Sequence, residues 1–156
     1  MIKIDKRFTE NLIEKALQSD RKRTTFNFHK ELSDSLQRMI NTMNTDTYVQ
    51  PHKHQNPDKR EVFILIKGKA LIVEFDDQGV VSDYILLDRM SESYGCEIEP
   101  GSWHTIICLE NNTLLYEVKD GPYDAFTDKK FAKWAPKEGD LNCLAYNKKI
   151  AKELGV

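Results

Sequence analysis

The stretch "PHKHQNPDKREVFILIKG" at residues 51–68 holds two of the chain's four histidines and an acidic residue that opens an apolar run. His52 and His54 are two residues apart, so in a strand their side chains leave from the same face, less than about 7 Å apart. Two imidazoles placed in this way can share one ion without distortion of the backbone. A hairpin-like connection and antiparallel pairing would bring Glu61 back beside both of them.

His104 can supply a further ligand from another strand, because it follows a Pro-Gly turn and begins the apolar run "WHTIICL". Two or three imidazoles with one carboxylate form a mixed nitrogen and oxygen site. Such a site suits Zn²⁺, Fe²⁺, Mn²⁺, Ni²⁺ or Cu²⁺ better than Ca²⁺ or Mg²⁺, which prefer oxygen ligands. The alternative is that the His-x-His pair lies on a solvated strand edge and binds nothing. The complete order of His52, His54, Glu61 and His104 favours the metal site.

The elements that must position these residues show two periodicities. Apolar residues recur at helical spacing in three segments, at 9–19, 33–43 and, more loosely, 141–154. Between Thr47 and Lys119 the chain changes to short apolar runs separated by turn signals such as "DDQG" and "PGS". Short strands at this spacing, without helices between them, indicate an antiparallel sandwich or barrel. We therefore expect helices, then the β unit, then a helix that packs outside it.

Composition excludes several classes of protein. The 156 residues are 40% hydrophobic and 31% charged with a net charge of -2, which is typical of one soluble domain and gives no sign of a nucleic-acid partner. The basic segment "DRKRTTF" at 20–26 is interpreted as a solvated helix end or loop. No apolar run approaches the roughly 18 residues of a membrane span. The three cysteines form no Cys-x-x-Cys pair, so we expect free thiols, no membrane association and a cytoplasmic location.

Two blocks of the sequence resemble the paired motifs of the cupin superfamily. The matching residues are His52, His54, Glu61 and Gly68 in the first block, and Gly95, Pro100, Gly101 and His104 in the second. The gap between His54 and Glu61 is longer than in the family pattern. Five segments, "FNFHKELSDSLQRMI", "TYVQPHKHQNPDKREVFILIKG", "EIEPGSWHTIICLE", "YEVKDGPYD" and "FAKWAPKEG", are together similar to the WbuC family of small cupin-fold metalloproteins. That resemblance covers about residues 23–140.

The resemblance implies a mainly β fold, the cupin double-stranded β-helix or jelly-roll barrel, with two N-terminal helices and one C-terminal helix. Within one structural domain we expect an N-terminal helical extension at 1–45, the cupin barrel at 46–122, and a C-terminal loop and helix at 123–156. The resemblance also implies one divalent transition metal ion (Zn, Fe, Mn or Ni) on the His/His/Glu/His set. A homodimer and a link to surface-polysaccharide gene clusters are further expectations from the family.

Three other side chains are candidates for catalysis. Strand parity would place Tyr48 on the face of the two histidines, where it could donate a proton; the alternative is a core aromatic. In "TLLYEVK", the alternation of residues predicts that Leu114, Tyr116 and Val118 are buried, and it leaves Glu117 and Lys119 on a solvated face. The family pattern instead places this charged pair and Tyr123 near the cavity rim. His29 lies outside both metal blocks and is interpreted as structural or solvent-facing.

These observations predict a cupin metalloprotein that acts on a carbohydrate or related small metabolite, such as a sugar or sugar nucleotide, in surface-polysaccharide biosynthesis. As an enzyme it would be of the isomerase or oxygenase type. The alternative is a non-catalytic, metal-dependent small-molecule binding or sensor module with the same site. A purely structural metal is disfavoured because closed structural zinc sites favour Cys ligands, and the ligand blocks contain none.

Overall fold

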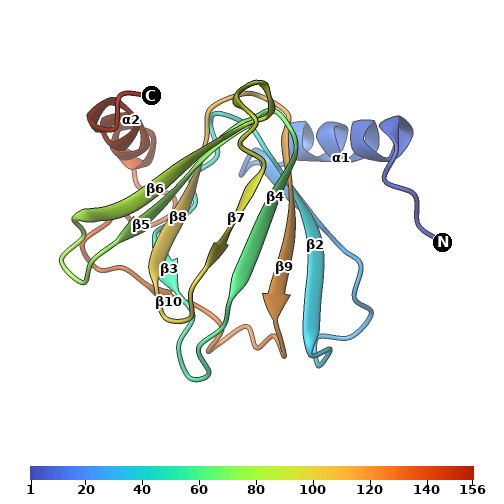
Figure 1. Ribbon diagram of the computed structural model, residues 1–156, viewed down its shortest axis with the longest axis horizontal. Helices are drawn as coiled ribbons and strands as arrows, with labels where there is room; N and C mark the ends of the chain where they lie inside the picture. The colour runs from blue at the N-terminus through green and yellow to red at the C-terminus, as the bar shows by residue number, and fades with distance from the viewer.

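The computed structural model describes residues 1–156 and contains two five-stranded antiparallel sheets and two α-helices (Figure 1). The first sheet has the order β1 (Arg23–Asn27), β2 (Leu36–Met43), β9 (Thr113–Asp120), β4 (Glu61–Lys67) and β7 (Gly95–Ile98). The second has the order β10 (Lys130–Phe131), β3 (His52–Lys53), β8 (Trp103–Cys108), β5 (Lys69–Phe75) and β6 (Val81–Asp88). The sheets are separate in their hydrogen bonding, so the β barrel is not closed.

The apolar core lies between the two sheets. On β4, Phe63 and Leu65 share the buried face of Glu61, as the period of two in the sequence predicts. On β8, Ile106 and Cys108 join the same core cluster, while the alternate residues Trp103 and Ile107 face the other way. That second face packs against α2 (Cys143–Glu153), which explains why every residue of β8 is buried.

The segment 33–43 forms strand β2 and not the second N-terminal helix that its apolar spacing predicts. β2 pairs with β1 along one edge and with β9 along the other, from Leu36 opposite Asp120 to Met43 opposite Thr113. These two ladders satisfy the backbone groups on both sides of the strand, and this tertiary context outweighs a weak local helical preference. The basic segment at 20–26 begins as the turn after α1, as expected, and its residues 23–26 belong to β1.

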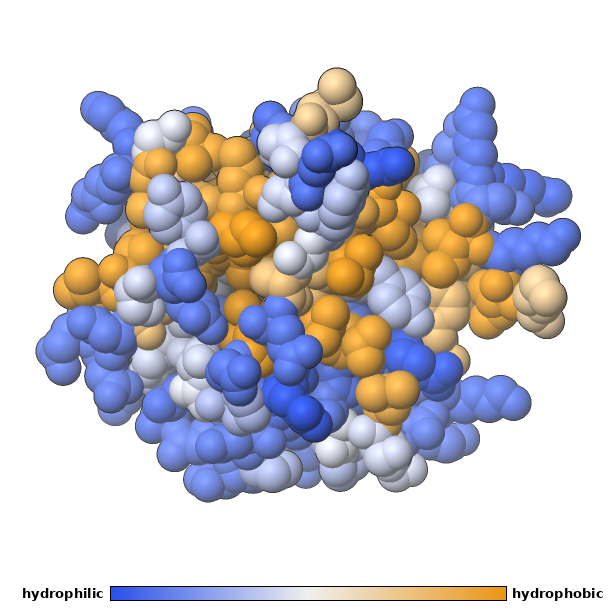
Figure 2. Space-filling model, in the orientation of Figure 1, coloured by the Kyte–Doolittle hydropathy of each residue, from blue (hydrophilic) through white to orange (hydrophobic).

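The two helices lie outside the sheets. α1 (Lys6–Gln18) begins after Asp5, whose carboxylate caps the Phe8 amide at 3.0 Å, and its buried Leu12 packs on Ile40 of β2. The structure therefore has one N-terminal helix in place of the two expected, and one C-terminal helix as expected. Neither helix has the length and apolarity that crossing a membrane would require. Figure 2 shows apolar and charged side chains intermixed on the face seen in Figure 1.

Candidate metal centre

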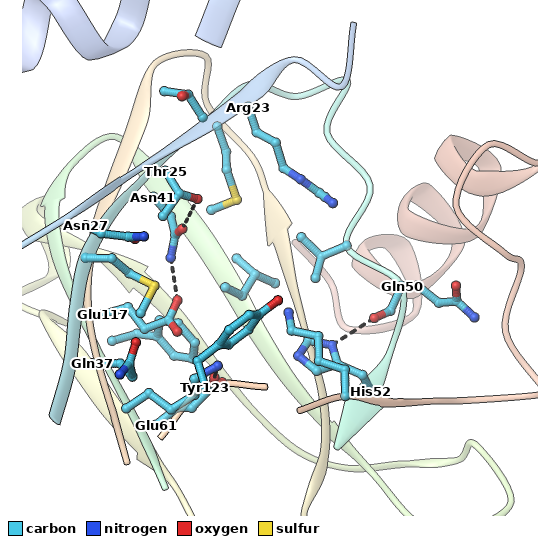
Figure 3. A pocket seen from close by; sticks show the side chains of 18 of the residues that line it. Arg23, Thr25, Asn27, Gln37, Asn41, Gln50, His52, Glu61, Glu117 and Tyr123 are labelled. Atoms are coloured by element: carbon cyan, nitrogen blue, oxygen red, sulfur yellow. Dashed lines mark hydrogen bonds and ion pairs between the residues drawn. The ribbon is translucent and has the colours of Figure 1, made fainter. Parts of the chain in front are cut away.

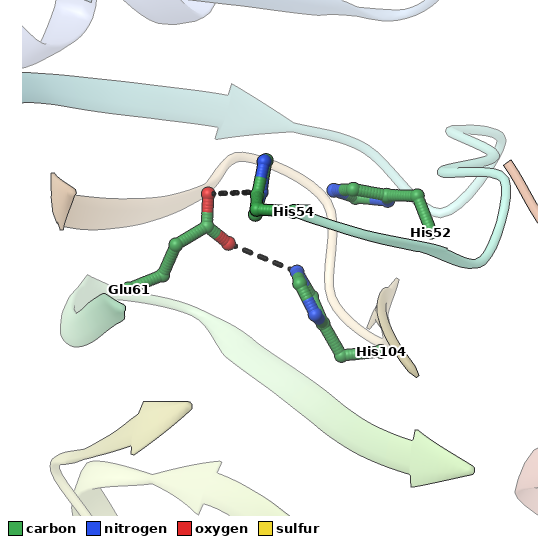
Figure 4. A group of neighbouring side chains, drawn as sticks. All are labelled: His52, His54, Glu61 and His104. Atoms are coloured by element: carbon green, nitrogen blue, oxygen red, sulfur yellow. Dashed lines mark ion pairs between the residues drawn. The ribbon is translucent and has the colours of Figure 1, made fainter. Parts of the chain in front are cut away.

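The four predicted ligands converge at one point between the sheets. His52 and His104 are directly opposite each other on β3 and β8, and Glu61 is the first residue of β4 in the other sheet. All four side chains are buried, and one ligand atom from each of His52, His54, Glu61 and His104 lies within 4.8 Å of all the others (Figure 4). The cluster can therefore hold a metal ion.

Each of the three imidazoles is oriented by a hydrogen bond between its Nδ1 atom and a main-chain carbonyl. The pairs are His52 with Gln50 (2.9 Å), His104 with Ser102 (3.0 Å) and His54 with Asp128. A carbonyl oxygen only accepts, so Nδ1 carries the proton in each ring. In the neutral imidazole this leaves Nε2 unprotonated, with its lone pair available as a metal ligand.

Two of these Nε2 atoms point at the Glu61 carboxylate. His54 Nε2 lies 2.9 Å from Oε1, and His104 Nε2 lies 2.9 Å from Oε2, while neither nitrogen has a hydrogen-bond partner. In the Nδ1-protonated tautomer these contacts set lone pairs against a carboxylate, which is not a hydrogen bond and is costly in a buried site. A cation shared by the nitrogens and the carboxylate removes that cost, so the residues fit a metal.

The charge state of His52 is the one that metal binding requires. Burial lowers the pKa of His52 well below its ordinary value, so this ring is neutral at neutral pH. Burial alone would raise the pKa of Glu61, and a cation beside the carboxylate would lower that pKa. Because a metal ligand must be unprotonated, the neutral His52 ring can bind a cation without loss of a proton. Three nitrogens and one carboxylate suit a divalent transition metal.

A buried charge cluster that the sequence pattern does not reveal lies next to this site. The Asp128 carboxylate accepts from Lys59 at 2.5 Å and from Lys119 at 2.7 Å, and all three side chains are buried. Lys119 Nζ is also 3.7 Å from Glu61 Oε1. Burial would lower the pKa of Lys119, but the carboxylates around it raise the pKa above its usual value, so the ammonium stays charged. Asp128 thus links the loop between β9 and β10 to both His54 and Lys119.

A cavity of about 500 Å³ opens beside the metal ligands, and Glu117 and Lys119 line it (Figure 3). Both residues are buried, so the solvated face that alternation predicts for them is wrong, and the apolar residues of β9 cover the opposite side. Asn41 Nδ2 donates to Glu117 at 2.5 Å. Burial and the charge of Glu61 raise the pKa of Glu117 to about 7.

Tyr48 follows the alternative of a core aromatic, and His29 lies at the cavity. Tyr48 is buried away from the cavity lining, and its hydroxyl donates to the Pro136 carbonyl at 2.7 Å. The parity argument fails there because β3 contains only His52 and Lys53, so the residues before it do not alternate as a strand. His29 does line the cavity, and its Nδ1 accepts from the Arg38 amide at 3.1 Å.

Comparison with protein families gives one match, in which the family model described as "Domain of unknown function (DUF6016)" matches residues 4–87. The chain belongs to this family. No curated protein matches the chain.

Several solved structures share the fold. The L-ribose isomerase of Cellulomonas parahominis with L-psicose has a TM-score of 0.56 and 13% identity, over 72% of this chain and 70% of that one. A cupin 2 domain-containing protein from Halorhodospira halophila has a TM-score of 0.52 and 15% identity, over 83% of this chain and 81% of that one. CapF with the inhibitor 3-isopropenyl-tropolone has a TM-score of 0.57 and 21% identity, over 72% of this chain and 32% of that one. The chain therefore shares its fold with these proteins, one of which is a cupin 2 domain-containing protein.

Proposed function

We propose that this member of the DUF6016 family is a metalloprotein with one divalent transition metal ion, Zn, Fe, Mn or Ni, bound by His52, His54, Glu61 and His104. The single observation that carries the proposal is the arrangement of the imidazoles. Their Nδ1 atoms donate to main-chain carbonyls, which leaves the Nε2 lone pairs free, and one ligand atom from each of the four residues lies within 4.8 Å of the others. Hydrogen bonds of this kind orient histidine ligands in metal sites.

The cavity beside the ligands is proposed to take a carbohydrate or a related small metabolite. Its volume of about 500 Å³ is in the range of small-molecule sites. Amide and hydroxyl groups line it, and these can bind the hydroxyls of such a ligand: Thr25, Asn27, Gln37, Asn41 and Gln50. The similar L-ribose isomerase has been solved with L-ribose and with L-psicose, which supports a sugar as the ligand of this cavity as well.

If the protein is an enzyme of the isomerase or oxygenase type, its own residues supply the proton transfers. A bound divalent ion would act as a Lewis acid on an oxygen of the ligand. Glu117, with a pKa of about 7, can hold or release a proton at its carboxylate near neutral pH. Lys119 keeps a positive charge beside Glu61 and Glu117. Tyr48 has no part in this proposal because its hydroxyl is bonded to Pro136.

The resemblance to the WbuC family supports a place in surface-polysaccharide biosynthesis, and the expectations of a homodimer and of a cytoplasmic location rest on the same family and composition arguments. A metal-dependent binding or sensor module would use the same ligands and the same cavity. The two functions differ in turnover. A sugar or sugar nucleotide that stabilises the metal-loaded protein without being converted would favour the binding module.

The metal site is tested by elemental analysis of the purified protein and two variants. We expect one divalent ion per chain in the wild type and its loss in His104→Ala. The matched control is His29→Ala, which removes another buried histidine of the cavity but none of the proposed ligands. Circular dichroism reports whether each variant is folded. A folded His104→Ala variant that keeps its metal would overturn the four-ligand site.

A further inference from the structure

We propose that the ligand of this cavity carries a negative charge, a carboxylate or a phosphate group, that binds to Lys129 and Arg23. The inference deepens the proposed function, on which it rests for the position of the metal. It is carried by the balance of charge around the cavity. Four cationic side chains line the cavity, Arg21, Arg23, Lys119 and Lys129, and the acidic groups near them do not compensate them.

At one end of the cavity two guanidinium groups share one carboxylate. Arg21 contacts Glu138 through Nε and Nη2, both at 2.7 Å, and Arg23 Nη2 contacts the same carboxylate at 2.9 and 3.0 Å. The Arg23 side chain is mostly buried, with 18% of it exposed, and its Nη1 donates to the Tyr48 carbonyl. Three charged groups with one negative charge among them leave a positive charge at this end.

Near the metal ligands, two cations again share one carboxylate that is not a metal ligand. The Asp128 carboxylate serves both Lys59 and Lys119, and the further carboxylate near Lys119, Glu61 at 3.7 Å, belongs to the proposed metal ligands. Lys119 lies on the side of the cluster that lines the cavity.

Lys129 is the cation without a partner. Its ammonium forms no ion pair and no hydrogen bond with the protein, although the side chain lines the cavity. Much of the residue's surface is exposed, so a ligand that enters the cavity from solvent can reach the ammonium. An unpaired cation in such a position gains most from an anionic ligand.

The acidic residues of the cavity do not remove this excess. The Glu61 carboxylate is directed at the two Nε2 atoms of the metal cluster. Glu117 is partly protonated at neutral pH and accepts from Asn41. A divalent ion on the four ligands would add further positive charge. Charge-assisted hydrogen bonds from guanidinium and ammonium groups to carboxylate or phosphate oxygens are the contacts that such a lining provides.

The residues of the cavity place the metal ligands and Arg23 at opposite ends. Figure 3 shows Arg23 across the cavity from Glu61, with Asn41 and Glu117 on one wall and Gln50 and His52 on the other. A ligand with oxygen donors at the metal end can therefore extend a charged group toward Arg23, and Lys129 lines the same cavity. Hydroxyl groups between these ends would meet the neutral amides of the walls.

The test compares three sugars that share one ring: neutral D-glucose, D-glucuronate with a carboxylate, and D-glucose 6-phosphate. Their affinities for the metal-loaded full chain are measured by calorimetry, for the wild type, Lys129→Gln and the control Lys133→Gln. Lys133 is exposed and lies outside the cavity lining. We expect at least one charged sugar to bind about tenfold more tightly than glucose, which corresponds to about 1.4 kcal/mol. Lys129→Gln should remove that preference, Lys133→Gln should keep it, and added salt should weaken it.

The outcomes distinguish a failure of the anion proposal from a failure of the metal proposal. A preference for glucuronate assigns a carboxylate, and a preference for glucose 6-phosphate assigns a phosphate. If neither charged sugar binds better than glucose, or if Lys129→Gln leaves the preference intact, the inference is wrong. Metal content is measured in the same samples. Absence of metal refutes the proposed function, whereas an anion preference that persists in chelator-treated protein upholds the charge argument by itself.

Discussion

Asp128 is buried between two lysine ammoniums, and Asp128→Asn removes the one carboxylate that both of them contact. The amide has nearly the shape of the carboxylate, so the substitution creates no cavity, but it removes the charge and one of the two acceptor oxygens. Lys119 would keep Glu61 at 3.7 Å, but Lys59 would keep only the Pro122 carbonyl and no counter-charge. The buried Lys59 ammonium is therefore the principal source of the expected loss.

The removal of one partner from a buried ion pair costs about 3–5 kcal/mol, because the remaining charge is left uncompensated. Since Lys119 keeps a second carboxylate, we expect the cost for this cluster to stay within that range and not to double. For a chain of this length the loss corresponds to a fall in Tm of about 10 °C. It should be present with and without metal, because the cluster does not include a proposed ligand.

Urea denaturation of the chelator-treated protein measures the loss directly. Asp124→Asn is the matched control, because it makes the same change in the same loop at an exposed position. An asparagine oxygen there can still accept from the Phe126 and Thr127 amides. We expect the control to change the unfolding free energy by less than about 0.5 kcal/mol. A loss below about 1 kcal/mol in Asp128→Asn would refute the reasoning, since the two lysines would then not depend on this charge.

Two further predictions concern pH and a turn. The Glu117 carboxyl has a pKa of about 7 in the fold and keeps its proton where the unfolded carboxyl has lost it, so the unfolding free energy of the metal-free protein should fall as pH rises. We expect a fall of about 3 kcal/mol between about pH 4 and pH 8, which Glu117→Gln should abolish in urea titrations; parallel curves would contradict the assignment. Gly68→Ala places a Cβ 2.3 Å from Thr113 Oγ1 at a φ of +83°. This substitution should lower the free energy of unfolding by about 2–4 kcal/mol in thermal or urea denaturation. Gly139→Ala, whose Cβ meets no atom, should lower it by about 1 kcal/mol. Equal losses would show that the chain moves to remove the clash with Thr113.

The convergence of His52, His54, Glu61 and His104 could be predicted because their order in the sequence resembles the paired cupin motifs. A turn followed by an apolar run also places Glu61 and His104 at strand starts, which is a local rule. The strand-parity rule is weaker here, because β3 contains only His52 and Lys53 and His54 lies beyond it. The meeting of β3, β4 and β8 at one point is not a local property.

The features that could not be predicted depend on which segments meet. Apolar residues of segment 33–43 fit a helix as well as a strand, and only the ladders to β1 and β9 decide between them. The neighbours of β9 also decide which of its faces turns toward the cavity, so alternation alone gave Glu117 the wrong environment. The contact between Lys59 and Asp128 joins residues far apart in the chain, and no period in the sequence marks it.

The main chain, and not any neighbouring side chain, sets the tautomer of all three imidazoles, since the acceptors of their Nδ1 protons are carbonyls of Gln50, Ser102 and Asp128. Peptide carbonyls are present whatever amino acid occupies a position. Evolution can therefore change Gln50 and Ser102, and the walls of the cavity with them, while the imidazoles remain set for an ion. Homologues of this chain can diverge in the molecule they recognise and still inherit the same metal-binding chemistry.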